Sequence, residues 1–313
     1  MCWKVLLTDG LSEINDPDLL AAVELIDKKG ISQEELVEVI SEIDAIVIRG
    51  RTKITQEVIS IAKNLKVIGR LGVGVDNIDL IAAETQGVTV VNTPVSTTIS
   101  VAELTMGLML SLIRDIPRAD AGMKAEQWLK KDLIGTELYR KTLGILGFGN
   151  IAKAVCRRSL AFGMKVLTYA YPSPEKDIQS LGVNSVSFDE LLKQSDIITI
   201  HVPHTTSTHY MVNAESINKM KDGVLIIDTS RGGVIEGNAL LEALESGKVA
   251  GAALDVFEVE PPIAGDPLST HPRVVATPHI GAQTKEAQLR AGHDLVSEVL
   301  AALEEKPLRW RVV

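Results

Sequence analysis

The chain has 313 residues, of which 45% are hydrophobic and 23% are charged, and these proportions are typical of a globular protein. Its length suits two domains, each able to bury a core. Its formal net charge of −9 at pH 7 argues against nucleic acid as a partner, because phosphate binding needs a basic surface. The two cysteines, Cys2 and Cys156, lie far apart and give neither a disulfide framework nor the spacing of a metal site.

The N-terminal segment MCWKVLLTDG is typical of a strand and not of a signal peptide, because it lacks a basic region followed by an apolar core. No apolar run reaches the roughly 18 residues that a membrane span needs. We therefore expect a cytoplasmic protein that has no membrane partner.

In the first part of the chain, short apolar runs alternate with amphipathic segments. The strands predicted there are Lys4–Leu7, Ala45–Ile48, Val67–Leu71 and Val88–Val91. The helices predicted there are Pro17–Lys28, Gln56–Ala62, Leu80–Thr85 and the longer Val101–Ile113. The polar segment Ala119–Arg140 is predicted to be a surface connection. Alternation of strands and helices predicts a parallel sheet.

The stretch KTLGILGFGNIA, Lys141–Ala152, combines a short apolar strand, a glycine turn and the start of a helix. This is the context of a dinucleotide fingerprint. There Gly147 would make the tight turn, Gly149 would let the backbone approach a pyrophosphate, and Ala152 would let the helix pack on the strand. An ordinary turn that needs glycine only for its backbone conformation is the alternative. The strand before and the helix after favour the dinucleotide site.

After this turn the alternation restarts. The strands predicted are Val166–Tyr169, Ile197–His201, Val224–Asp228, Val249–Leu254 and Val274–Ala276. The helices predicted are Asp189–Lys193, Ala214–Met220, Asn238–Ser246 and Thr284–Leu303. The restart predicts two α/β domains that join near Asn92–Val101.

Two loops in the first half carry groups suited to binding an anion. Gly72 and Gly74 follow an apolar strand and would leave N–H groups exposed as a cradle for a carboxylate, although a purely structural turn has the same spacing. Arg49 and Arg51 lie in the loop just after another predicted strand, and an arginine there suits bidentate binding of a carboxylate or phosphate. A solvated loop charge is the alternative, and it is favoured for Arg51.

Three residues in the second half follow predicted strands and could do chemistry. Arg231 lies just past a strand's carboxyl end, where ligands bind in open α/β sheets. Glu260 and His279 could form a carboxylate–imidazole pair that fixes the histidine tautomer and makes it a general acid/base for carbonyl–alcohol interconversion. Taken singly, each is more often structural. The spacing of the remaining histidines predicts no metal site.

Together and in this order, the stretches resemble the D-isomer-specific 2-hydroxyacid dehydrogenase family, and within it the short form of D-3-phosphoglycerate dehydrogenase without a regulatory domain. The motifs that carry this resemblance are GRLGVGVDNID, SVAE, KTLGILGFGNIA, HVPHTTST, DTSRGGV, LDVFEVEP and TPHIGA. The resemblance implies an α/β fold with two doubly wound parallel-sheet domains. A Rossmann-type dinucleotide-binding domain, residues 98–283, would be inserted into a flavodoxin-like substrate domain, residues 1–97 and 284–313, with the active site between them.

The resemblance also implies transfer of a hydride between a nicotinamide cofactor and a D-2-hydroxy acid or 2-oxo acid. Arg231 would bind the substrate's carbonyl and carboxylate oxygens, His279 would exchange the proton, and Glu260 would pair with His279. The implied substrate contacts are Arg49, Val73 and Gly74. The implied cofactor contacts are Gly147, Gly149, Asn150, Ile151, Ala170, His201, Pro203, Thr208, Thr229, Ser230, Arg231, Asp255, His279, Gly281 and Ala282, with Asp255 facing the nicotinamide carboxamide.

Two positions depart from the family's usual pattern. Ala170 stands where an acidic residue usually takes the ribose hydroxyls, so we expect relaxed use of NAD or NADP, with NAD slightly favoured. Thr97 stands where asparagine is frequent, and this could shift the substrate preference. Glu260 argues against a formate dehydrogenase, which has glutamine there.

Two alternatives to phosphoglycerate dehydrogenase stay open. One is a hydroxypyruvate/glyoxylate reductase or another D-2-hydroxyacid dehydrogenase. The other, from a different class, is an NAD(H)-sensing binding protein like the corepressors of this fold. The helix Val101–Ile113 and the segment around Trp128 resemble the family's dimer-forming region, so we expect a homodimer.

Overall fold

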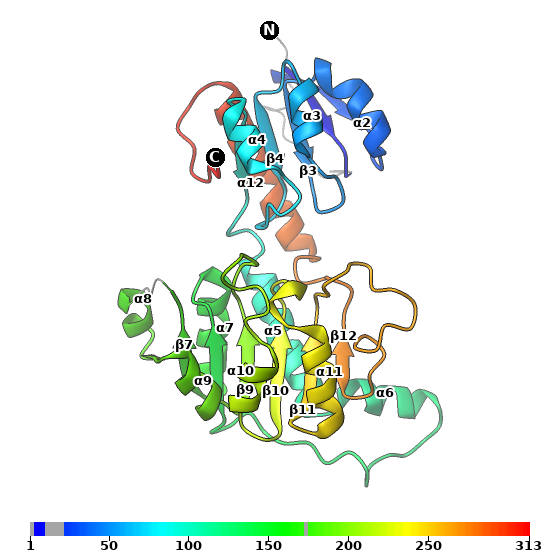
Figure 1. The fold of residues 1–313 in the computed structure, drawn as a ribbon, viewed down its shortest axis with the longest axis vertical. Helices are drawn as coiled ribbons and strands as arrows, with labels where there is room; N and C mark the ends of the chain where they lie inside the picture. The colour runs from blue at the N-terminus through cyan, green and yellow to red at the C-terminus, as the bar shows by residue number, and fades with distance from the viewer. Residues whose placement is uncertain (1–2, 10–21, 172–174) are drawn as a thin grey trace. The chain divides into compact units, whose positions relative to one another are not determined.

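A computed structural model describes residues 3–9, 22–171 and 175–313 (Figure 1). The chain forms two units, one made of Met1–Thr97 together with Ala282–Val313, the other of Thr98–Gly281. We call them unit 1 and unit 2 and describe each by itself. None of the helices within the described ranges is long and apolar enough to cross a membrane.

Unit 1 is built on a parallel sheet of five strands. Their order is β2 (Val23–Asp27), β1 (Trp3–Leu7), β3 (Ala45–Ile48), β4 (Val67–Arg70) and β5 (Thr89–Asn92). This is the flavodoxin-like order, in which the connections change direction between β1 and β3. Strands β1, β3 and β4 are short β-branched or leucine-rich runs with mostly buried side chains, as expected for strands covered on both faces.

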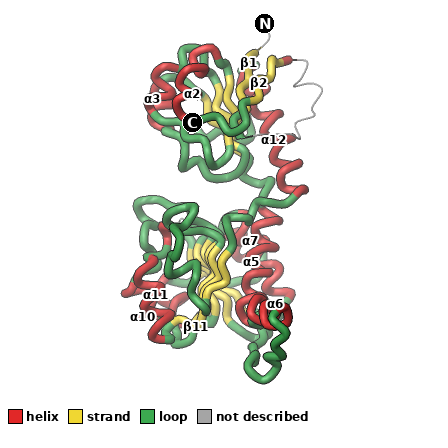
Figure 2. Tube along the Cα trace, turned by 90° about the vertical axis from the view of Figure 1, so that its right-hand side faces the viewer, coloured by secondary structure: helices red, strands yellow, loops and turns green. Residues whose placement is uncertain are grey.

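Helices cover both faces of this sheet (Figure 2). One face packs on α2 (Gln33–Val39), α3 (Gln56–Ile61) and α4 (Leu80–Thr85), and the other on α12 (Lys285–Leu303). A short 3₁₀ helix, η1 (Ile40–Glu42), follows α2. Side chains of Ser32, Thr55 and Asp79 cap the N-termini of α2, α3 and α4, which fixes where each helix begins.

The predicted helix Pro17–Lys28 is wrong over Val23–Asp27, which form β2, and its first five residues lie outside the described ranges. Each residue of β2 pairs in register with β1, from Trp3 with Val23 to Leu7 with Asp27. The helical pattern of this stretch is therefore overridden by pairing with a neighbouring strand. Helix α2 was not predicted from the sequence.

Unit 2 contains a parallel sheet of seven strands. Their order is β12 (Val274–Ala276), β11 (Val249–Leu254), β10 (Val224–Asp228), β9 (Ile197–Ile200), β6 (Thr142–Leu146), β7 (Lys165–Tyr169) and β8 (Asn184–Ser185). The run from β8 to β11 has the Rossmann order, and its connections change direction between β6 and β9. The predicted pair of parallel-sheet α/β domains is thus confirmed.

Helices also cover both faces of the second sheet. Figure 2 shows α5 (Thr98–Ile113) and α7 (Asn150–Ala161) along one face, and α10 (Ala214–Lys219) and α11 (Gly237–Ser246) along the other. Helix α9 (Phe188–Gln194) joins the second group. Two helices were not predicted: α6 (Ile116–Lys124), which occupies the start of the predicted surface connection, and α8 (Glu175–Ser180).

Candidate active site

The glycine turn after β6 has the backbone geometry that the fingerprint requires. Gly147 has φ of 90°, and a Cβ atom built on it would lie 2.6 Å from the carbonyl oxygen of His201. Only glycine fits this turn, because a side chain would be both strained and obstructed. Ala152 is fully buried where α7 packs on the sheet.

The end of α7 beside this turn is suited to an anion. Gly149 is the N-cap of α7, and it has no side chain that could accept from the first N–H groups of the helix. Apart from its chain neighbours, no described atom lies within 4 Å of where its Cβ would stand, so the space beside this helix end is open. The N–H groups at the start of α7, those of Asn150 and Ile151 among them, can therefore donate to a pyrophosphate, and the helix dipole favours its charge. The turn also lies where the connections of the sheet change direction, so these residues fit a bound dinucleotide.

The loop after β9 faces the same edge of the sheet. The His201 N–H donates to the Leu146 carbonyl over 2.8 Å, which ties this loop to the glycine turn. Burial lowers the pKa of His201 to about 3, so its imidazole is neutral at pH 7. Further on, Thr208 Oγ1 donates to the Pro203 carbonyl over 2.6 Å and fixes the turn between these two residues.

The turn that carries Arg231 is fastened by a buried carboxyl. Asp228, at the end of β10, is 1% exposed, and its Oδ1 accepts hydrogen bonds from Ser230 N–H (2.7 Å) and Ser230 Oγ (2.6 Å). Thr229 contacts Thr105 of α5 through their hydroxyls at 3.0 Å. Arg231 Nη1 donates to the Ser230 carbonyl over 2.7 Å, which orients the guanidinium.

The residue after Arg231 locks the turn in place. A Cβ on Gly232 would lie 2.0 Å from the carbonyl carbon of Phe257, so η2 (Gly232–Val234) packs directly on the loop that carries Glu260. The charge of Arg231 helps to lower the pKa of Glu260, after the larger effects of that carboxyl's hydrogen bonds. The structure thus brings these two predicted residues together.

Sequence reasoning did not single out Asp228, although it ends a predicted strand. Burial raises its pKa to about 7, against the opposing effect of the Ser230 hydrogen bonds and the Arg231 charge, and with a further rise from Asp255. The folded state therefore keeps a proton that the unfolded chain releases near pH 4. Stability contributed by this group is lost as the pH rises from about 4 to about 7.

Asp228→Asn is expected to stabilise the protein in a pH-dependent way. The amide keeps an oxygen acceptor for Ser230 and removes the buried ionisation, so the gain should be on the order of 4 kcal/mol above pH 7 and should shrink toward zero near pH 4. Denaturant unfolding of both proteins at pH 4, 6 and 8 measures this difference. A gain that does not vary with pH would contradict it.

The loop after β12 is wrapped around Asp255. This residue is 1% exposed, and its carboxylate accepts hydrogen bonds from Thr277 Oγ1 (2.6 Å), Ile280 N–H (2.8 Å) and Gly281 N–H (2.8 Å). The His279 N–H donates to the Asp255 carbonyl over 2.9 Å, and His279 has φ of 53°. Asp255 therefore holds the loop that presents His279.

His279 and Glu260 form the predicted pair. Nδ1 of His279 lies 2.6 Å from Oε2 of Glu260, while Oε1 of Glu260 accepts the Phe257 N–H over 3.1 Å. Burial alone would raise the pKa of Glu260, but the His279 and Phe257 hydrogen bonds, with the charges of His279 and Arg231, hold it below its usual value. The carboxylate stays ionised and fixes the proton on Nδ1, which leaves Nε2 for a ligand.

Arg231, Glu260 and His279 thus follow three neighbouring parallel strands of unit 2 and share the carboxyl edge that also carries the glycine turn. Ala170 lies just after β7 on that edge, partly buried against the core. The predicted contact Ala282 is the first residue of the chain's return to unit 1.

The predicted substrate contacts lie at the carboxyl edge of the sheet in unit 1. Arg49 follows β3, and its guanidinium Nε is buried with no hydrogen-bond partner among the described residues. Val73 and Gly74 follow β4. The Val73 carbonyl accepts a hydrogen bond from Asn92 Nδ2 over 2.7 Å, which ties this turn to the end of β5.

Comparisons with known proteins show to which family the chain is similar. The protein-family model described as "D-isomer specific 2-hydroxyacid dehydrogenase, NAD binding domain" matches residues 106–281 of the chain. The hydroxypyruvate reductase of Thermotoga maritima is 48% identical over 93% of this chain and 97% of its own. The D-3-phosphoglycerate dehydrogenase of Methanocaldococcus jannaschii is 46% identical over 96% of this chain, which spans 57% of that enzyme's length.

Two solved structures of enzymes are also similar to this chain in fold and sequence. A glyoxylate reductase from Paecilomyes thermophila superposes with a TM-score of 0.92 at 32% identity, over 99% of this chain and 98% of its own. D-lactate dehydrogenase from Aquifex aeolicus, complexed with NAD and lactic acid, gives 0.83 at 33% identity, with 96% of each chain covered.

The chain therefore belongs to the D-isomer specific 2-hydroxyacid dehydrogenase family. It is an oxidoreductase that uses a nicotinamide cofactor and acts on the CH–OH group of a 2-hydroxy acid. The predicted family, fold class and enzyme class are confirmed, whereas the roles of individual residues stay predictions.

Proposed function

We propose that this enzyme reduces a 2-oxo acid to a D-2-hydroxy acid, and reverses the reaction, through Arg231, Glu260 and His279. The observation that carries the proposal is the 2.6 Å contact between His279 and Glu260 on the sheet edge that also bears the glycine turn. A nicotinamide held there supplies the hydride chemistry. The protein's own contribution is to grip the substrate and to move one proton.

The three residues divide that work. The planar fork of Arg231 binds the carbonyl oxygen and one carboxylate oxygen together, which fixes the orientation of the substrate. His279 donates a proton from Nε2 to the carbonyl oxygen during reduction and takes it back during oxidation. Glu260 holds the imidazole in the required tautomer.

For the substrate, we propose a phosphoglycerate-type acid, which carries a second anionic group. Arg49 supports this choice, because its buried Nε has no protein partner among the described residues and its guanidinium can bind a phosphate. Hydroxypyruvate or glyoxylate is the alternative, and the names of two similar proteins favour it.

A substrate panel decides between them. It contains the 3-phosphate of hydroxypyruvate, hydroxypyruvate itself and glyoxylate, each assayed in the direction of reduction with NADH and with NADPH at the absorbance of reduced nicotinamide. We expect the highest kcat/KM with the phosphorylated acid. Equal or lower values with it would remove the phosphoglycerate assignment, and activity on none of the three would favour the binding-protein alternative.

The cofactor preference is expected to depend on Ala170. Ala170→Asp should lower kcat/KM with NADP by about tenfold or more, because a carboxylate there would repel the 2′-phosphate. The value with NAD should stay the same or rise. Ala170→Asn is the matched control, since it adds similar volume without charge. Equal losses with both cofactors would contradict this role of position 170.

We also propose that the enzyme is a homodimer formed through α5, α6 and the segment after α6. Supporting it, Ile116, Met123, Trp128 and Ile134 are exposed in the isolated chain, and Figures 1 and 2 show α6 and the following segment extending away from the rest of unit 2. Equilibrium sedimentation should give twice the monomer mass, and the monomer mass at micromolar concentration would contradict the proposal.

A further inference from the structure

The place where the sheet of unit 1 changes the direction of its connections lies between β1 and β3. In open α/β sheets, ligands bind outside the carboxyl ends of the strands at this position. Unit 2 carries its glycine turn at the corresponding position. Unit 1 instead carries Asp9 after β1 and two arginines, Arg49 and Arg51, after β3.

Each of the three guanidinium nitrogens of Arg51 donates one hydrogen bond to the protein. Its Nε donates to Asp9 Oδ1 over 3.0 Å, Nη1 to the Ile31 carbonyl over 3.1 Å, and Nη2 to the Thr8 carbonyl over 3.1 Å. The side chain of Asp9 is 7% exposed and that of Arg51 is 52% exposed, so the carboxylate is buried while the guanidinium stays partly open to solvent. This one guanidinium ties together three loops, and its charge is balanced by Asp9.

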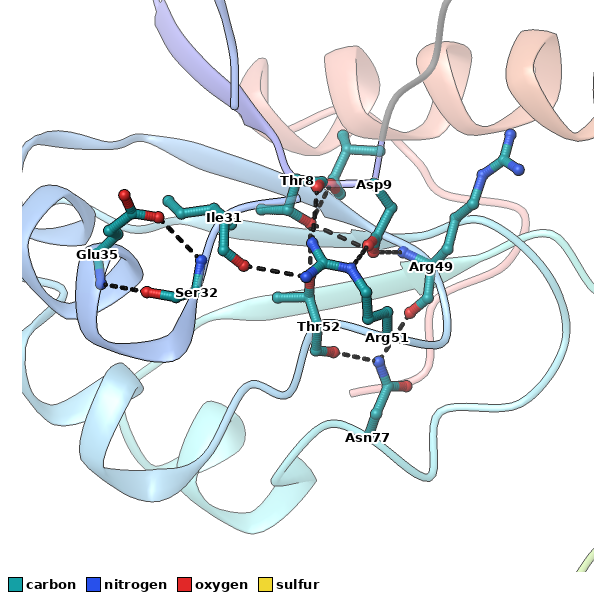
Figure 3. A network of polar contacts seen from close by, with 10 residues as sticks. Thr8, Asp9, Ile31, Ser32, Glu35, Arg49, Arg51, Thr52 and Asn77 are labelled. Atoms are coloured by element: carbon teal, nitrogen blue, oxygen red, sulfur yellow. Dashed lines mark hydrogen bonds and ion pairs between the residues drawn. The ribbon is translucent and has the colours of Figure 1, made fainter. Parts of the chain in front are cut away.

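Among the described residues, the hydrogen bonds that hold Arg49 are made by its backbone. Its N–H donates to Asp9 Oδ2 over 2.7 Å, and its carbonyl accepts from Asn77 Nδ2 over 2.8 Å. Figure 3 shows the side chain of Arg49 turning away from the hydrogen-bonded group of residues. Its Nε is buried with no hydrogen-bond partner among the described residues, and a donor in that state is costly until a ligand pairs with it.

Each carboxylate oxygen of Asp9 therefore accepts a hydrogen bond from a different arginine. One oxygen balances the charge of Arg51, and the other fixes the backbone of Arg49. The three charges sum to one net positive charge, and Arg49 is the group whose guanidinium is left for an anion. We propose that Asp9 and Arg51 form a clamp that presets Arg49 to bind a distal anionic group of the substrate, separate from its 2-oxo acid group. This inference rests on the proposed function and deepens it: Asp9 and Arg51 are positioning residues, and they determine specificity for substrates with a distal anion.

The test compares two substrates in variants of Arg51. One is a 2-oxo acid with a phosphate on C3, and the other is glyoxylate, which has no distal group. Arg51→Lys keeps the positive charge but cannot reach all three acceptors, so KM for the phosphorylated acid should rise about tenfold with kcat within about twofold. Kinetic values with glyoxylate should stay unchanged, which also shows that the variant folds.

Lys53→Met is the matched control. It removes a charge of the same sign from an exposed side chain in the same loop, outside the clamp. It should change KM for the phosphorylated acid by less than about twofold, because exposed charges are screened. A rise equal to that in Arg51→Met would mean that only the total charge matters and would overturn the clamp.

A double-mutant cycle shows whether Arg51 acts through Arg49. Arg49→Met should raise KM for the phosphorylated acid more than Arg51→Met, and the double variant should be no worse than Arg49→Met alone. Additive effects would overturn the clamp. A wild type that does not distinguish the two substrates overturns the phosphorylated substrate itself, whereas a preference that Arg51→Lys fully retains overturns only the clamp.

Discussion

Replacement of His279 by alanine is expected to lower kcat by about 10²- to 10⁴-fold, the range that general acid–base catalysis contributes. The reason is the position of the imidazole: Nδ1 is 2.6 Å from Glu260 Oε2, and the backbone N–H is fixed on the Asp255 carbonyl. No other described side chain in this loop has a group that can exchange a proton near neutral pH. Steady-state kinetics with any accepted 2-oxo acid measure the loss.

Binding of the reduced cofactor should be nearly intact in that variant, because the glycine turn and α7 are untouched. Fluorescence titration of the bound nicotinamide measures this directly. His293→Ala is the matched control, since His293 is exposed on α12 in unit 1 and its loss should leave kcat unchanged. A His279→Ala enzyme with near-normal turnover would refute the assignment.

Replacement of Arg231 should lower kcat/KM about as strongly as replacement of His279 lowers kcat. Loss of two charged hydrogen bonds to the substrate corresponds to about 3–6 kcal/mol, so Arg231→Ala should lower kcat/KM by about 10²- to 10⁴-fold. Arg231→Lys keeps the charge but loses the planar fork, and it should recover only part of this loss.

The structure explains why Arg231→Lys should recover only part of the activity that Arg231→Ala loses. The guanidinium is oriented by its bond to the Ser230 carbonyl, on a turn that Asp228 fastens and Gly232 packs against the Phe257 backbone. A lysine ammonium has one donor centre in place of this fork. If Arg231→Lys matched the wild type while Arg231→Ala lost only a few-fold, Arg231 would act as a point charge and the bidentate grip would be wrong.

Sequence patterns predicted most strands well, because strands buried on both faces are short apolar runs that stand out from their surroundings. They also located the glycine turn, since strand, glycines and helix follow one another without a gap. The pattern failed at Val23–Asp27, where pairing with β1 decides the structure. It also missed α6 and α8, which are short and rich in polar residues.

For the site, positions after strand ends made Arg231, Glu260 and His279 candidates, because parallel strands place their carboxyl ends at one edge, and the family resemblance combined them into one predicted site. The supporting residues could not be found in this way. Asp228 fastens the Arg231 turn and Asp9 serves two arginines through hydrogen bonds that depend on the folded backbone. The expectation of a solvated charge holds only in part for Arg51: its side chain is 52% exposed, yet its guanidinium donates to acceptors in two other loops.

The most direct test of the central claim follows the hydride itself. Hydroxypyruvate is reduced with cofactor that carries deuterium at both C4 positions of the nicotinamide, and the glycerate formed is analysed by mass spectrometry and chiral separation. We predict D-glycerate with one deuterium at C2, formed by the wild type and at a strongly reduced rate by His279→Ala. Glycerate of the L configuration, or glycerate without deuterium at C2, would contradict the proposed reaction.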